Sequence, residues 1–291
     1  MTTEPIDTKI KELIAKPENR IKLHDLVHNE TEKLYDAIDK LQVPAGNSKE
    51  ALEAAREWLL QAEEASATLV KIFAYGCYFG SPEHAYLWKK SLERLAEPHA
   101  STEFQRKLEL YPVMLLMYAG GVSAVTASNG AALKALIDSQ ISNEYRNSQT
   151  PMGNEVNGWL FDQQQGNLIL GLENHKTPIS DHVHEVISKV YPDTLANEKV
   201  FTSMYDQWDI IMAMSVAHYR NDGESRPWAP VGRFAWRSEK NGTTQLDIIQ
   251  EAVKVFGSEW LPIKIGMFNS NAEAAEQALE VIRGQAGSLR F

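Results

Sequence analysis

Two histidines and a glutamate follow one another at intervals of four residues near the start of the chain. His24, His28 and Glu32 lie in the segment from Arg20 to Leu41. If that segment is helical, residues four apart share a face, so the two imidazoles and the carboxylate point the same way. Imidazole nitrogens and carboxylate oxygens are zinc ligands. This face is a candidate metal site, and a metal-dependent hydrolase using these three residues is our alternative hypothesis for function.

Two features of the sequence count against a metal site. Asp25 follows His24, whereas the helical His-pair signature of zinc metalloproteases carries a glutamate there as its base. The sequence identifies no further ligand, and a solvated polar helix face accounts for the same residues. The chain also lacks a phosphate-binding glycine loop, because Gly120-Gly121 is not followed by Lys and Ser or Thr. We therefore expect neither a metal ion nor a cofactor.

Arginine and tryptophan gather in one segment of the C-terminal half. Arg226, Trp228, Arg233 and Arg237 are neighbours there, with Trp236 among them. Arginine supplies planar, always-charged donors, and tryptophan is favoured at the centre of protein interfaces. The alternative is an ordinary loop with two buried indoles and exposed charges. We take Arg226, Trp228, Arg233 and Arg237 as the candidate contacts for a protein partner.

Three other reactive side chains have simpler explanations. Thr177-Pro178 predicts the start of a helix, on which His182 and His184 point to different sides. We interpret both histidines as polar surface residues. Cys77 has apolar neighbours, and a lone cysteine in such a setting is typically a small core residue.

Composition excludes several classes of protein. The chain has 291 residues, 43% of them hydrophobic, a formal net charge of -10 and one cysteine. The negative charge disfavours nucleic-acid binding, which needs a basic surface. A single cysteine fits a reducing compartment, and the polar N-terminal residues do not form a signal peptide. We expect a soluble cytoplasmic protein.

One apolar stretch, from Leu108 to Ile141, must be buried by the rest of the chain. It carries no charge between Glu109 and Lys134, and this uncharged segment is long enough for a bilayer span. Pro112 is expected to restrict Tyr111 and kink the helix near its start. Ser128-Asn129-Gly130 predicts a corner between two helices.

The remaining segment, Val113–Ala127, has the length of a buried core helix. We therefore predict a helical hairpin without a membrane span. Its small residues, Ala119-Gly120-Gly121, would let a neighbouring helix approach closely.

Helical spacing of apolar residues dominates the rest of the chain. In Arg20–Leu41, for example, Leu23, Val27 and Leu34 form one stripe. We predict an all-α fold, built of antiparallel helix pairs that form a bundle or a short solenoid-like array. Minor β structure is expected only within residues 230–270, where Phe234–Arg237 suggests a short strand.

The polar residues after the apolar stretch divide the chain. We predict a helical domain over residues 1–145, a linker or surface loop over 146–158 and a second, mainly helical domain over 159–291. A single large helical domain is the alternative.

Three segments are similar to segments of known proteins: RIKLHDLVHNETEKL, LELYPVMLLMYAGGVSAV and VGRFAWR. They resemble helical segments of bacterial multidomain and defence-type proteins. The resemblance implies a bacterial sensing or regulatory module. Together with the absence of a catalytic signature, it makes a non-enzymatic helical module that binds a protein partner our leading hypothesis.

Overall fold

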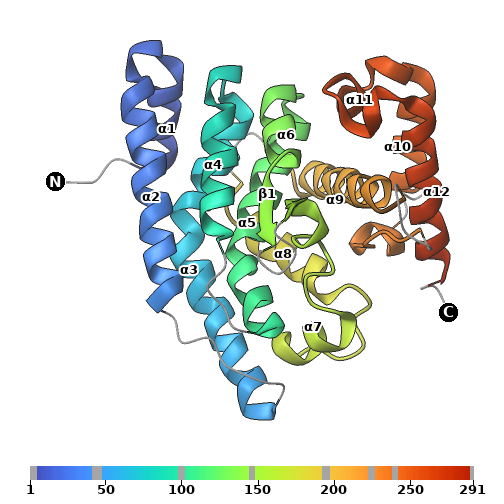
Figure 1. Ribbon diagram of the computed structural model, residues 1–291, viewed down its shortest axis with the longest axis horizontal. Helices are drawn as coiled ribbons and strands as arrows, with labels where there is room; N and C mark the ends of the chain where they lie inside the picture. The colour runs from blue at the N-terminus through green and yellow to red at the C-terminus, as the bar shows by residue number, and fades with distance from the viewer. Residues whose placement is uncertain are drawn as a thin grey trace.

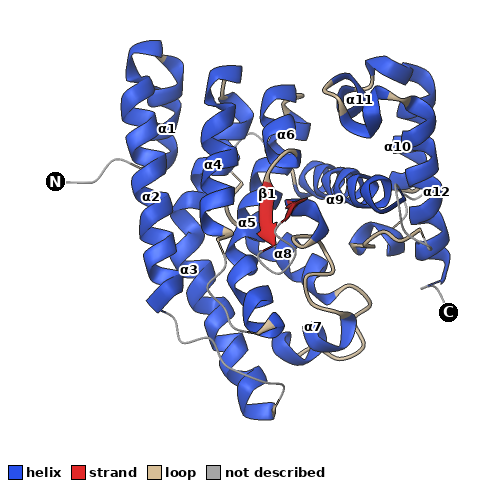
Figure 2. Cartoon of the chain, viewed as in Figure 1, coloured by secondary structure: helices blue, strands red, loops and turns tan. Residues whose placement is uncertain are grey.

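The computed structural model describes residues 5–40, 48–97, 102–143, 148–191, 197–221, 227–237 and 242–288. Within them the chain is helical apart from turns and one two-stranded hairpin, so the predicted all-α class is confirmed (Figures 1 and 2). The helices pack on one another without a central sheet.

The N-terminal part is a set of antiparallel helices packed side by side (Figure 1). The stripe predicted from Leu23, Val27 and Leu34 is buried, and it holds the second helix against the third and fourth. The helices are α1 (Ile6–Ala15), α2 (Arg20–Lys40), α3 (Lys49–Phe79) and α4 (Ala85–Leu95).

The central helix of the fold is α5 (Glu103–Thr126), which is longer than the sequence predicted. Thr102 caps its start by accepting a hydrogen bond from the Gln105 amide. The expected start of the core helix at Val113 is wrong, because α5 begins at Glu103 and contains Pro112. Proline removes one backbone hydrogen bond, and burial of the apolar residues on both sides offsets that loss.

This helix is long and apolar enough to cross a membrane, and 94% of its most apolar window is buried inside the protein. The helix is therefore longer than the core helix of Val113–Ala127 that the sequence predicted. The predicted burial of the stretch by the rest of the chain is confirmed.

The corner after α5 forms as predicted. Ser128 adopts a left-handed conformation, and Asn129 caps α6 (Gly130–Ile137) by accepting from the Ala132 amide. The Asn129 amide also donates to the carbonyls of Cys77 and Gly80. The corner is therefore tied to the end of α3.

The small residues of α5 bring two other helices close. A Cβ at Gly120 would lie 3.0 Å from the Cys77 sulfur on α3. A Cβ at Gly121 would lie 2.6 Å from Cζ2 of Trp208 on α9 (Glu198–Asn221), and nearer still to other atoms of that indole. The predicted close approach of neighbouring helices to these glycines is thus confirmed. Helix α3 approaches at Gly120 and α9 at Gly121.

The short sheet lies outside the interval where it was expected. Strands β1 (Gln140–Asn143) and β2 (Ser148–Pro151) pair antiparallel, with Gln140 opposite Pro151. In residues 230–270 the described part of the chain forms helices and turns instead, including the turn η5 (Arg233–Trp236). Phe234 and Ala235 are adjacent and both buried, which is incompatible with the alternation of a half-exposed strand.

Two hydrophobic clusters organise the core. One extends from Ile10 to Met212 and the other from Ile210 to Ala286, so they meet on α9. The division into two domains at residues 146–158 stays a prediction. The remaining helices are α7 (Gln163–Leu170), α8 (Pro178–Ser188), α10 (Gln245–Phe256), α11 (Leu261–Lys264) and α12 (Ala272–Ser288).

Candidate functional site

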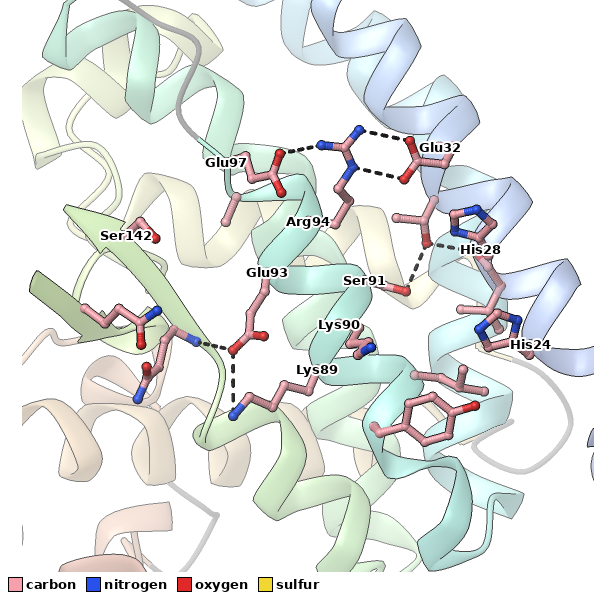
Figure 3. Close-up of a pocket in the computed structure, with 17 residues that line it drawn as sticks. His24, His28, Glu32, Lys89, Lys90, Ser91, Glu93, Arg94, Glu97 and Ser142 are labelled. Carbon is pink, nitrogen blue, oxygen red and sulfur yellow. Dashed lines mark hydrogen bonds and ion pairs between the residues drawn. The ribbon is translucent and has the colours of Figure 1, made fainter. Parts of the chain in front are cut away.

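A hollow of about 600 Å³ lies over the outer face of α4, with α2 on one side and the β1–β2 hairpin on the other (Figure 3). His24, His28 and Glu32 all line it from α2. The sequence placed these three side chains on one helix face, and that face is a wall of the hollow. We call this hollow the α4 groove.

Helix α4 supplies the base of the groove because its two faces differ in polarity. Leu87, Trp88 and Leu92 are buried against the core. The residues at helical spacing on the opposite face are polar or charged and line the groove. They are Tyr86, Lys89, Lys90, Glu93, Arg94 and Glu97.

A buried pair of hydroxyls fixes α2 against α4 beneath the groove. The Thr31 hydroxyl lies 2.9 Å from Ser91 Oγ and 2.8 Å from the Val27 carbonyl. Both side chains are almost fully buried. Since a buried hydroxyl without a partner is costly, this contact sets the register between the two helices.

Arg94 binds the carboxylates at one end of the groove. Its Nε and one Nη each donate to a different oxygen of Glu32, both at 3.0 Å, and the other Nη pairs with Glu97. The ring of Tyr35 lies 3.6 Å from the guanidinium carbon. The bonds from Arg94 hold the pKa of the Glu32 carboxyl below its usual value. Glu32 is therefore engaged by a planar, two-pronged ion pair.

The geometry does not suit the metal hypothesis as the sequence posed it. Both Glu32 oxygens already accept from Arg94, so the carboxylate would have to leave that pair before it could ligate an ion. In the described residues, no group of three His, Cys, Asp or Glu side chains is placed to hold a metal ion. His24 and His28 share a wall without a third free ligand beside them.

The groove carries three acidic side chains, and each has a partner within the protein. Glu32 and Glu97 pair with Arg94. Glu93 lies 3.7 Å from Lys89 Nζ and accepts from the Gln140 amide at 3.1 Å. Each carboxylate of the groove thus has a partner, but Arg94 is shared by two of them, so Lys89, Lys90 and Arg94 together balance the three glutamates.

One positive side chain of the groove, Lys90, is not paired with a carboxylate in the described part of the chain. Within the described residues, Lys90 makes no hydrogen bond or ion pair, and it is exposed between α4 and the histidines of α2 (Figure 3). His28 is exposed too and makes no hydrogen bond to the described part of the chain. The ring of His24 stacks between those of His28 and Tyr86, with centroids 6.1 Å and 6.4 Å away.

The hairpin adds neutral hydrogen-bonding groups on the far side. Ser142 and Gln149 are cross-strand partners, so their side chains share one face of the hairpin with Gln140. All three are exposed and line the groove. Ile141, on the other face, is buried. A ligand in the groove therefore meets amide and hydroxyl groups opposite the imidazoles.

The arginines predicted to contact a partner lie partly inside the protein. The Arg233 side chain is only 11% exposed, with Nε 3.7 Å from Oδ1 of Asp206, whereas Arg237 is 46% exposed, with Nε 3.5 Å from Oδ2. Trp228 is half-buried against Trp159. Arg226 lies outside the described residues. Of the predicted contacts that are described, Arg237 and Trp228 keep accessible surface, and Arg233 is committed to the interior.

A second carboxylate lies in the interior beside Asp206. Asp209 accepts from the Tyr118 hydroxyl at 2.6 Å and from Ser180 Oγ at 3.0 Å. Burial raises the pKa of Asp206 to about 7, against the lowering effect of the two arginines, and the pKa of Asp209 to about 6. Gly232 packs so closely on Asp209 that no side chain fits there. The network anchors residues 231–237 to α8 and α9.

No pattern in the sequence indicates this network. Asp206 and Asp209 stand in a segment whose pattern indicated only a buried aromatic face. The carboxylates pair with residues on other elements, and nothing in local spacing shows such contacts.

The histidines of α8 do point to different sides, as predicted, but the interpretation as surface residues is wrong. His182 Nε2 lies 2.8 Å from Oε1 of Glu63 on α3. His184 Nε2 lies 3.0 Å from the Thr202 hydroxyl on α9, and burial lowers its pKa to about 3. Both tie α8 to its neighbours. Cys77 is buried, as expected of a small core residue, and burial raises the pKa of its thiol.

The α4 groove combines a lysine without a partner in the described part of the chain, two exposed imidazoles and a row of neutral hydrogen-bonding groups, and each of its carboxylates already has a partner. Such a surface can hold an anionic group. Comparison with protein families, with curated proteins and with solved structures finds no match to this chain.

Proposed function

We propose that the protein is a non-enzymatic helical interaction module whose α4 groove binds an acidic segment of a protein partner. The observation that carries the proposal is the imbalance of pairing in the groove. Glu32, Glu93 and Glu97 have partners, while Lys90 has none among the described residues. Lys90 is therefore available to pair with a carboxylate of a ligand.

Charge complementarity supports an acidic protein segment. On a chain of net charge -10, a local positive site attracts carboxylates and leaves most of the surface repulsive to them. The formal net charge of -10 disfavours a nucleic acid, which binds mainly through contacts of its phosphates with a basic surface. The amides of the hairpin suit the backbone of a peptide.

The wider setting follows from the sequence. We place the module in the bacterial cytoplasm as part of a sensing or defence-type system, on the strength of the resemblance of its segments, its single cysteine and its charge. Trp228 and Arg237 form a second candidate contact for the partner, on another part of the surface.

A binding measurement on charge-reversed variants tests the proposal. Fluorescein-labelled peptides of Asp and Glu, about twelve residues long, are compared with Asn and Gln counterparts by fluorescence anisotropy. We expect the acidic peptides to bind the wild type. Lys90→Glu should lower their affinity about 10-fold or more, which corresponds to a binding free energy of about 1.4 kcal/mol, in the range of interface hot spots. Lys254→Glu, at an exposed lysine on α10, is the matched control and should leave affinity unchanged.

Two results would contradict the proposal. Equal binding of the acidic and amide peptides would show that carboxylates are not recognised. Tighter binding of a single-stranded oligonucleotide than of any acidic peptide would favour a nucleic-acid ligand instead.

The metal-dependent hydrolase remains the second candidate because His24, His28 and Glu32 line one hollow. Elemental analysis of protein purified without chelators separates the two. The interaction module predicts zinc far below one ion per chain, unaffected by His24→Ala. Stoichiometric zinc that His24→Ala removes would favour the hydrolase.

A further inference from the structure

A second hollow, of about 440 Å³, adjoins the α4 groove. It lies between α6, the hairpin, α9 and the turn η7 (Met267–Ser270). Lys89 and Gln140 line both hollows. The two cavities are therefore neighbours on either side of the contact between α4 and β1, and a single extended ligand can reach both.

The second hollow differs from the first in chemistry. Its cations are paired: Lys134 lies 2.7 Å from Asp138, and Lys89 pairs with Glu93. The rest of the lining combines neutral polar groups with apolar and aromatic side chains, of which Tyr219 is the most exposed aromatic. Tyr219 is 46% exposed, and the ring of His218 meets Phe268 edge to face at 5.7 Å. This hollow suits an uncharged side chain with a large apolar surface.

The wall of this hollow includes an unusual turn. Phe268, Asn269 and Ser270 all have positive φ, between 54° and 57°, directly after Gly266 and Met267. Residues other than glycine rarely adopt this conformation, although asparagine tolerates it better than phenylalanine or serine. The turn buries the Phe268 ring and lets Asn269 line the hollow. Strain of this kind is concentrated in binding sites, where the surroundings maintain it.

We infer that the two hollows are one bipartite site for an extended segment of a partner protein. Acidic residues of the segment lie over Lys90 and His28, and an aromatic or large aliphatic residue enters the second hollow beside Tyr219 and Phe268. The inference rests on the proposed function, because it specifies the partner segment that the α4 groove would bind.

A peptide scan tests this arrangement. One phenylalanine is moved position by position along the acidic peptides of about twelve residues, and each peptide is compared with its alanine counterpart. We expect at least one position at which phenylalanine improves affinity about 10-fold, as burial of one aromatic anchor does. Tyr219→Ala removes part of the aromatic lining of the second hollow, and Ser215→Leu narrows the hollow. Either substitution should abolish the gain in affinity from phenylalanine and leave the dependence on acidic residues intact. Phe256→Ala, at an exposed aromatic residue of α10, is the control.

The outcomes separate this inference from the proposed function. If acidic peptides bind in a Lys90-dependent way but no phenylalanine position adds affinity, or the gain survives both variants, the bipartite site is wrong and the acidic groove stands. If no acidic peptide binds, the proposed function itself fails. Melting temperatures of all variants confirm that each one is folded.

Discussion

Replacing Arg233 by methionine is expected to lower the free energy of unfolding by about 3–5 kcal/mol at pH 8. Arg233 lies in the interior beside Asp206, whose side chain is only 2% exposed. Methionine keeps much of the volume and removes the charge, so the carboxylate is left with Arg237 as its only cationic neighbour among the described residues. Urea denaturation followed by circular dichroism measures the change.

The pH dependence of the loss identifies its cause. The folded-state pKa of Asp206, about 7, already exceeds its ordinary value, so ionisation costs the folded state and stability falls as pH rises toward 7. Arg233→Met raises that folded-state pKa further, which extends the loss to higher pH. We therefore expect a smaller difference between variant and wild type at pH 5, where Asp206 is protonated in both folded proteins, than at pH 8.

Arg237→Met is the matched control for this prediction. Its side chain is half-exposed, and an exposed ion pair is worth about 0–1 kcal/mol. A loss at Arg233 that does not change with pH would show that the charge of Arg233 does not stabilise residues 231–237. An equal loss in the two variants would show that burial of Arg233 does not distinguish it from Arg237.

Gly121→Ala is expected to destabilise the protein by about 3 kcal/mol. The new methyl group would overlap the indole of Trp208, which is fully buried and held edge to face against Tyr118. Neither α5 nor α9 can move without disturbing the core on its other side, and overpacking of this kind costs about 1–3 kcal/mol or more. Thermal unfolding measured by calorimetry gives the change.

A second glycine supplies the control. Gly284 lies within α12, and a Cβ there meets no atom within 4 Å. Gly284→Ala should stabilise the protein by about 0.5–1 kcal/mol through helix propensity alone. Trp208→Leu, which makes room for the methyl group, should reduce the additional cost of Gly121→Ala. Full additivity of the two substitutions would argue against the predicted contact.

Much of the fold could be predicted because it depends on local pattern. Spacing placed His24, His28 and Glu32 on one face, and Asn129 with Gly130 marked the corner between two helices. The helix start expected at Val113 was wrong because a local rule was applied to a helix that the surrounding core holds together. Propensity yields to packing when most of the segment is buried.

The site itself depends on contacts that local pattern cannot show. Arg94 binds Glu32 across 62 residues of sequence, and this pair decides that the carboxylate is not a free ligand. Arg233 pairs with Asp206, which changes it from a candidate surface contact into an interior one. Lys90 is notable only because its neighbours are already paired. In each case the chemistry of a residue is set by a partner on another helix.

The most direct test of the account follows the histidine side chains by NMR during a titration with an acidic peptide. His24 and His28 lie in the α4 groove, whereas His175 is exposed on the segment between α7 and α8. We predict that the imidazole carbon-bound proton signals of His24 and His28 shift in proportion to bound peptide, that those of His175 do not, and that Lys90→Glu suppresses the shifts. Saturable binding of the peptide with no change at His24 or His28 would place the binding site elsewhere and contradict the account.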